Sequence, residues 1–172
     1  MCIRDSAPVA RAVAHQVPDA QFLWWGLDLA GERVDEVRRD LQRCGVAERV
    51  RLMESTSAPQ HLLHACDVFW SASREDPYPL TLAEAARAGV PIVASDAGGA
   101  TELLGRSDER GLLVPPIDAA AAAGAIVALA ESPVLRSRLA SASADFVAEE
   151  LSFDHFAADV ANDLTEATRQ IS

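Results

Sequence analysis

Two carboxylates, Asp76 and Glu84, lie with seven residues between them in a stretch that changes from loop to helix. Pro77 and Pro79 stiffen the loop, because each proline fixes its own φ and disfavours helical geometry in the residue before it. The N–H groups at the start of a helix attract phosphate, and a glutamate one turn inside that helix can accept hydrogen bonds from sugar hydroxyls. These residue types, in this order, indicate a site for a nucleotide-linked sugar.

The elements that would position this pair follow directly in the sequence. A helical pattern begins near Leu80, and Gly89 with a proline two residues later stops it. The apolar run 91–94 is typical of a buried parallel strand, and it ends in the glycine-containing turn 95–99. We therefore expect the acidic loop, the helix start and the glycine turn to meet at one edge of a sheet.

This stretch resembles the donor-binding signature of family 4 retaining glycosyltransferases, which have the GT-B fold. In that signature an acidic residue and seven others precede EA-x-A-x-G-x-P-I/V-V-A-x-D-x-G-G-x-x-E. The matching positions here are Asp76, the run from Glu84 to Gly99, and Glu102. The family usually has glutamate first, so Asp76 is shorter by one methylene. The spacing to Glu84 selects Asp76 for that position rather than its neighbour Glu75.

The resemblance implies a role for several residues at the carboxyl ends of the strands. Asp76 would be the catalytic acid beside the transferring sugar, and Glu84 would bind the ribose hydroxyls. The loop after the second strand would flank the nucleotide base. The residues assigned to donor binding are Glu84, Tyr78, Pro79, Leu80, Thr81, Gly26 and Glu54. The resemblance implies no metal ion and no cofactor besides the nucleotide-diphosphate sugar itself.

Some of these residues also have a purely structural interpretation, which the sequence leaves open. Gly26 could be only a turn glycine, and Glu84 could be a first-turn glutamate favoured by the helix dipole. Tyr78 could be a packing aromatic, and Glu102 a surface acid at the start of a helical turn.

Strands and helices alternate along the chain in the manner of βαβ units, which predicts an α/β fold. We expect a Rossmann-like, doubly wound parallel sheet, the C-terminal half of a GT-B fold, with two further helices at the end of the chain. All strands are expected in one sheet with helices on both faces. The predicted strands are 21–26, 49–53, 68–71, 91–94 and 111–114. The predicted helices are 7–16, 32–44, 59–66, a helix from 80, 118–130, 133–151 and 153–171.

Residues 1–6 share no pattern with the remainder, and we interpret them as an artefact of expression or sequence assembly. Residues 7–172 are interpreted as a single nucleotide-sugar (donor) binding domain from which the N-terminal acceptor domain is missing. On this interpretation the helix 7–16 has lost its beginning.

Composition excludes several classes of function. The chain has a formal charge of −11 and no lysine, which excludes a nucleic-acid binder. It has no apolar run long enough for a transmembrane segment and no secretory signal. Its three cysteines lack C-x-x-C spacing, which favours a reducing, cytoplasmic location. His61, His64 and Cys66 lie close together in sequence, but no fourth ligand follows at a metal-binding spacing.

The resemblance implies a hexosyltransferase-like enzyme that transfers a sugar, with retention, from a nucleotide diphosphate to a hydroxyl of a sugar, lipid or other acceptor. The acceptor would bind to the missing domain. In the family an arginine–lysine pair upstream of this part stabilises the departing diphosphate, so we expect the isolated chain to be inactive. Two alternatives stay open: a non-catalytic nucleotide-sugar-binding remnant, and another GT-B enzyme such as a nucleotide-sugar epimerase.

Overall fold

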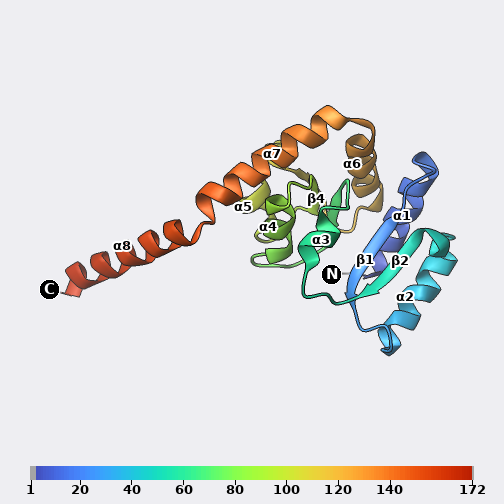
Figure 1. Ribbon diagram of the computed structural model, residues 1–172, viewed down its shortest axis with the longest axis horizontal. Coiled ribbons are helices and arrows are strands. Elements are labelled where there is room, and N and C mark those ends of the chain that lie inside the picture. The colour runs from blue at the N-terminus through green and yellow to red at the C-terminus, as the bar shows by residue number, and fades with distance from the viewer. Residues whose placement is uncertain (1–2, 172) are drawn as a thin grey trace.

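The computed structural model describes residues 3–171, in which parallel strands alternate with helices (Figure 1). The strands are β1 Phe22–Leu27, β2 Val50–Glu54, β3 Phe69–Ser71, β4 Ile92–Ser95 and β5 Leu112–Val114. The helices are α1 Ile3–Gln16, α2 Glu32–Arg43, the 3₁₀ turn η1 Ala47–Arg49, α3 Pro59–Leu63, α4 Leu80–Arg87, α5 Ala100–Leu104, α6 Ala119–Glu131, α7 Pro133–Glu150 and α8 Phe153–Ile171. The predicted α/β fold is confirmed, and every predicted strand and helix is present. The short helix α5 and the turn η1 were not predicted.

The prediction of one continuous sheet is wrong in detail, because the strands form two parallel ladders, β1–β2 and β3–β4–β5. Two features limit pairing between β1 and β3. The register of β1 shifts between Trp24 and Leu27, where Gly26 has a φ of +86°, and β3 is only three residues long. The ladders meet instead through side chains: the rings of Trp25 and Phe69 lie 6.1 Å apart, centroid to centroid.

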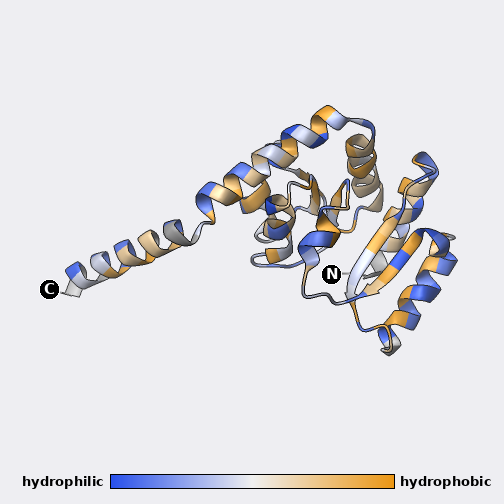
Figure 2. Cartoon of the chain, viewed as in Figure 1, coloured by the Kyte–Doolittle hydropathy of each residue, from blue (hydrophilic) through white to orange (hydrophobic). Residues whose placement is uncertain are grey.

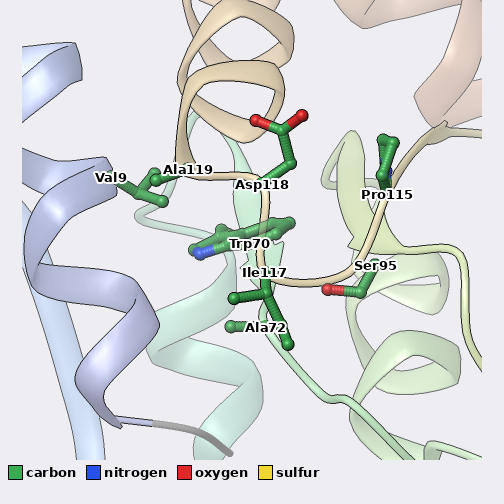
Figure 3. A pocket seen from close by; sticks show the side chains of 8 residues that line it. All are labelled: Val9, Trp70, Ala72, Ser95, Pro115, Ile117, Asp118 and Ala119. Atoms are coloured by element: carbon green, nitrogen blue, oxygen red, sulfur yellow. The ribbon is translucent and has the colours of Figure 1, made fainter.

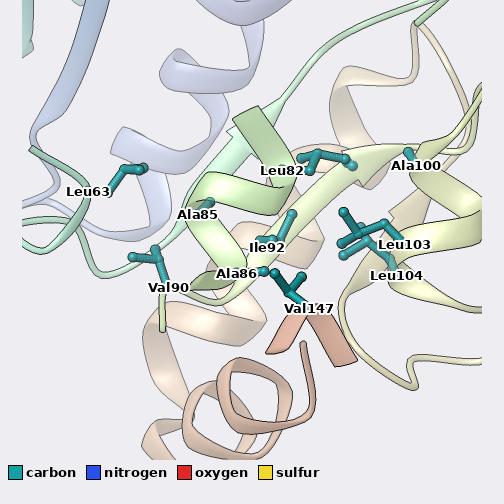
Figure 4. Close-up of a cluster of buried hydrophobic side chains, with 11 residues drawn as sticks. Leu63, Leu82, Ala85, Ala86, Val90, Ile92, Ala100, Leu103, Leu104 and Val147 are labelled. Carbon is teal, nitrogen blue, oxygen red and sulfur yellow. The ribbon is translucent and has the colours of Figure 1, made fainter. Parts of the chain in front are cut away.

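Strand β4 is the centre of the core. All four of its residues are buried, as expected for a parallel strand covered on both faces. Ile92 packs in a cluster with α4, α5 and α7, which Figure 4 shows, whereas Val93 packs in a second cluster with α1 and α6. Helices therefore cover both faces of the β3–β4–β5 ladder, which is the doubly wound arrangement.

The β1–β2 ladder has a cluster of its own with α1 and α2. Trp24 is buried there beside Val37 and Leu41 of α2. The outer face of α2 is polar, and the alternation of polar and apolar residues along this helix is visible in Figure 2. Adjacent strand residues point to opposite faces, so Trp24 and Trp25 enter different clusters.

Helix α1 begins at Ile3, four residues before the predicted start. Part of the segment that was excluded from the fold is therefore helical in the structure. The apolar side of α1 packs against α6, and Val9 and Val13 are each 2% exposed. The artefactual origin of residues 1–6 stays a prediction.

Helix α8 projects away from the rest of the molecule (Figure 1). Every α8 side chain whose exposure the structure describes is exposed, including those of Phe156, Val160 and Leu164. In the described part of the chain, no single helix has the length and apolar content needed to cross a bilayer. Among the described residues, α6 and the stretch 133–166 reach that length and apolar content when they are taken together, but the chain bends by 104° between them.

Candidate functional site

The acidic loop, residues 72–79, connects β3 to α4. Within it the Oδ1 atom of Asp76 accepts a hydrogen bond from the N–H of Tyr78 at 3.2 Å, which closes an Asx turn. The two prolines restrict φ on either side of that turn. The loop's own sequence therefore restricts its conformation. Asp76 is partly buried, whereas Glu75 is exposed.

Helix α4 follows the loop directly, with Pro79 at its N-cap position. Proline has no polar side chain, and no side chain caps the N–H groups of the first turn in the described residues. Leu82, Ala85 and Ala86 pack in the core and hold the N-terminus of the helix in place. The N–H of Leu82 donates to the carbonyl of Pro79, which leaves the N–H groups of Leu80 and Thr81 for a ligand.

The opposite end of α4 is closed by a Schellman motif. Gly89, at a φ of +70°, donates its N–H to the carbonyl of Ala86, and Val90 donates to the carbonyl of Ala85. Glu84 lies on the exposed side of the helix. It is one turn inside the N-terminus, the position that suits a carboxylate contacting the sugar of a bound nucleotide.

The turn after β4 lies against the acidic loop. Gly99 donates its N–H to the main-chain carbonyl of Asp76 at 3.0 Å. The predicted meeting of the loop, the start of α4 and the glycine turn is therefore present in the structure.

Two further acids, Glu102 and Asp96, lie near this loop. Burial, and then the nearby Glu102, raise the pKa of Tyr78 above that of an ordinary tyrosine, although 41% of Tyr78 is exposed. Asp96 instead accepts a hydrogen bond from Thr101 Oγ1 at 2.7 Å, and Arg106 lies 3.9 Å from its other oxygen. The carboxylate of Asp96 therefore interacts with the start of α5 rather than with the acidic loop.

The predicted site residues fall into two groups. The structure brings Asp76, Tyr78, Pro79, Leu80, Thr81 and Glu84 together on the acidic loop and α4. Gly26 and Glu54 lie on the other ladder, where Leu27 is paired with Glu54. A Cβ added to Gly26 would meet nothing within 4 Å, so Gly26 is required there for its positive φ rather than for close packing.

A small hollow, which the sequence did not predict, lies at the carboxyl ends of β3, β4 and β5, and the Trp70 ring is at its centre (Figure 3). Its lining residues are Val9, Trp70, Ala72, Ser95, Pro115, Ile117, Asp118 and Ala119. The Nε1 atom of Trp70 is buried and has no hydrogen-bond partner among the described residues. The order of residue types carries no signal for this hollow, because it depends on how α1 and α6 meet.

The chain is similar to several known proteins. Residues 5–132 match the family model described as "Glycosyl transferases group 1". The chain is 34% identical over 133 residues to the lipopolysaccharide core biosynthesis mannosyltransferase LpsB of Rhizobium meliloti (strain 1021), a match that covers 72% of this chain and 37% of that protein. It is 35% identical over 118 residues to the phosphatidyl-myo-inositol mannosyltransferase of Mycobacterium leprae (strain TN), with 67% and 31% covered. The matches thus span about a third of these relatives.

Solved structures show the same fold. The structure of Anabaena Alr3699/HepE in complex with UDP and glucose matches with a TM-score of 0.81 and 25% identity, over 92% of this chain and 44% of that one. The C-terminal domain of the group 1 glycosyl transferase LpcC from Francisella tularensis matches with a TM-score of 0.74 and 20% identity, over 87% and 79%. The second match, at its lower identity, concerns the fold alone.

Proposed function

Because this chain belongs to the family of glycosyl transferases group 1, we propose that it binds a nucleotide-diphosphate sugar between the acidic loop and the N-terminus of α4. The observation that carries the proposal is the arrangement of charge around α4. The uncapped first turn offers N–H groups to phosphate, while Asp76 and Glu84 lie before and after that turn as acceptors for hydroxyls.

Each residue has a distinct task in this proposal. The carboxylate of Glu84 accepts charge-assisted hydrogen bonds from the ribose hydroxyls. The first-turn N–H groups of α4, at Leu80 and Thr81, hold the diphosphate. Asp76 lies beside the sugar, where it can bind hydroxyls or stabilise positive charge that develops at the anomeric carbon. Gly26 and Glu54, at the ends of β1 and β2, border the nucleotide base.

The proposed reaction is transfer of the sugar to an acceptor hydroxyl with retained anomeric configuration, as in family 4. The site lowers the barrier by holding the donor in place and by stabilising charge on the departing diphosphate. We assign acceptor binding, and an arginine–lysine pair for the diphosphate, to an N-terminal domain outside this chain. The chain alone then binds nucleotide weakly and transfers nothing. The proposed reaction needs no metal ion. The proposed location of the enzyme is the cytoplasm.

The experiment that tests donor binding is Glu84→Gln. Losing a charge-assisted pair of hydrogen bonds should cost about 1.5–3 kcal/mol of binding free energy, which weakens affinity roughly tenfold or more. Isothermal titration calorimetry of the chain with UDP and with GDP measures this, and the thermal unfolding midpoint should stay unchanged because Glu84 is exposed.

Glu131→Gln is the matched control, because it removes the same charge from an exposed position at the end of α6. Its nucleotide affinity should equal that of the unsubstituted chain. If Glu84→Gln also retained full affinity, Glu84 would be only a helix-start residue and the proposed orientation of the donor would be wrong.

A further inference from the structure

The turn formed by Gly98 and Gly99 crosses the acidic loop at a main-chain contact that admits no side chain. A Cβ atom built on Gly98 would lie 2.0 Å from the carbonyl oxygen of Asp76, and one built on Gly99 would lie 2.3 Å from the carbonyl oxygen of Pro77. Real Cβ atoms essentially never come within 3.0 Å of such an atom. Both positions therefore require glycine because of what lies opposite them.

Two hydrogen bonds hold Asp76 at this crossing, one to its main-chain carbonyl and one to its carboxylate. Its main-chain carbonyl accepts from the N–H of Gly99 at 3.0 Å, and its side-chain Oδ1 accepts from the N–H of Tyr78 at 3.2 Å. The first bond ties the residue to the end of β4, which is fully buried, and the second ties it to the approach to α4. The glycine turn thus holds the main chain of Asp76, and the Asx turn within the loop orients its carboxylate.

We propose that Gly98 and Gly99 are positioning residues for donor binding, since their close approach fixes Asp76 and the first turn of α4 relative to β4. This inference rests on the proposed function for the identity of the ligand. The two glycines act through the acidic loop. A methyl group at either position must displace the loop by about 1 Å to reach the shortest distance that real Cβ atoms show, and errors of that size in a binding site are costly.

Gly99→Ala is the most direct test. Gly99 has a φ of −70°, which alanine adopts without strain, so the clash with the Pro77 carbonyl is the main effect. Gly98→Ala adds the strain of a φ of +56° to its clash with the Asp76 carbonyl.

Gly89→Ala is the matched control for both variants. Gly89 lies at the far end of the same helix and has a φ of +70°, but an added Cβ would meet nothing within 4 Å. It carries the left-handed strain without any clash against the loop. A general loss of stability should therefore appear in Gly89→Ala and Gly98→Ala alike, whereas displacement of the loop should appear only in the substitutions at 98 and 99.

Two readouts separate positioning from stability. Hydrogen exchange of the Tyr78 amide, which donates to the carboxylate of Asp76, should be at least tenfold faster in Gly99→Ala and Gly98→Ala than in the unsubstituted chain, and unchanged in Gly89→Ala. The affinity for UDP or GDP, whichever the unsubstituted chain binds more tightly, should fall tenfold or more in the first two variants and less than twofold in the control. Normal exchange in the loop of Gly99→Ala would overturn the inference, and so would a displaced loop with full affinity.

A measurement on the unsubstituted chain covers the case in which the alanine variants do not fold. By NMR, the amide of Gly99 should be protected from exchange, and saturating nucleotide should protect it further, together with the amides of Tyr78, Leu80 and Thr81. A Gly99 amide that exchanges freely would overturn the inference. If the chain bound neither nucleotide, the proposed function would fail, whereas the protection of Gly99 would still show whether the turn fixes the loop.

Discussion

At the scale of single residues, Asp76 and its neighbour Glu75 differ in how they are held. Asp76 is partly buried, and both its carbonyl and its carboxylate accept hydrogen bonds from main-chain N–H groups. Glu75 is exposed, and its carbonyl accepts a long hydrogen bond of 3.4 Å from Ser73 Oγ. A carboxylate that is already held in place needs little reorganisation as charge develops during a reaction.

The first residue-scale prediction concerns these two acids in the intact enzyme. Asp76→Asn should reduce kcat about a hundredfold while donor affinity changes little, because it removes charge that acts mainly in the transition state. Asp76→Glu should retain substantial activity, since it restores the residue that the family usually has. Steady-state kinetics measures both, with Glu75→Gln as the matched control. A damaging Glu75→Gln beside a nearly silent Asp76→Asn would show that the motif had been aligned one residue out of place.

The second residue-scale prediction concerns Ile117, which has a φ of +67° and is 63% exposed. A β-branched residue in the left-handed region is strained by about 1–2 kcal/mol, and little burial compensates it here. Ile117→Gly should raise the free energy of unfolding by about 1 kcal/mol, seen as a rise of roughly 2–4 °C in the unfolding midpoint. Ile117→Ala keeps a Cβ and most of the strain, so it should gain less. Equal midpoints for the two variants would show that φ is not the cause.

At the scale of helices and strands, the sequence predicted most elements because their ends carry explicit signals. Helix α4 lies between Pro79 and Gly89, and β4 is an uninterrupted apolar run, so both were located within one or two residues. Helix α5 was missed because five residues are too few to show a helical period. The division into two ladders was missed because it depends on the main-chain conformation at Gly26 and on the shortness of β3.

The candidate site was predictable where its residues are contiguous in the sequence, and not where it depends on contacts between distant segments. Asp76 and Glu84 stand out by spacing within one contiguous stretch. The contact between the glycine turn and the acidic loop joins two main-chain segments some twenty residues apart, so no side-chain pattern records it. Two adjacent glycines after a buried strand were the available signal, because such a pair often marks a close approach of backbone. The buried Nε1 of Trp70 had no signal of this kind.

The element-scale prediction concerns Arg110, which joins α5 to α7. Its guanidinium donates to the carbonyls of Leu103 at 2.7 Å and of Glu102 at 3.0 Å, and it lies 4.0 Å above the ring of Phe146. Arg110→Lys should lower the free energy of unfolding by about 1–2 kcal/mol, because an ammonium group cannot make the planar two-carbonyl contact and stack at once. Urea denaturation measures the loss. Arg106→Lys is the control and should be neutral, since Arg106 is exposed and its ion pair is long; equal losses would contradict the prediction.

At the scale of the whole molecule, stability is unevenly distributed between the two C-terminal helices. Helix α7 contributes Leu139, Ser143 and Val147 to the interior, each no more than 2% exposed. The described side chains of α8 are all exposed. A helix that buries so little of itself adds little to the cooperative unit.

The whole-molecule prediction follows from this difference. Truncation after Ser152, which removes α8, should change the thermal unfolding midpoint by less than about 2 °C, because the α8 side chains whose exposure is described are all exposed. Truncation after Ser132, which also removes α7, should abolish cooperative unfolding. Differential scanning calorimetry distinguishes the two chains. A fall of more than about 5 °C on removal of α8 alone would mean that this helix packs against the body of the protein.

The placement of the three tryptophans gives this chain an unusual spectroscopic character. Trp24 and Trp25 lie on β1 and Trp70 on β3, so all the indole emission comes from the two strands at which the ladders face each other. Far-ultraviolet circular dichroism is dominated instead by the helices, α8 among them. A fluorescence melting curve therefore follows the loss of packing around β1 and β3, while the dichroism curve adds the loss of helices such as α8, whose described side chains are exposed. The difference in temperature between the two midpoints measures how cooperatively the strands and the helices unfold.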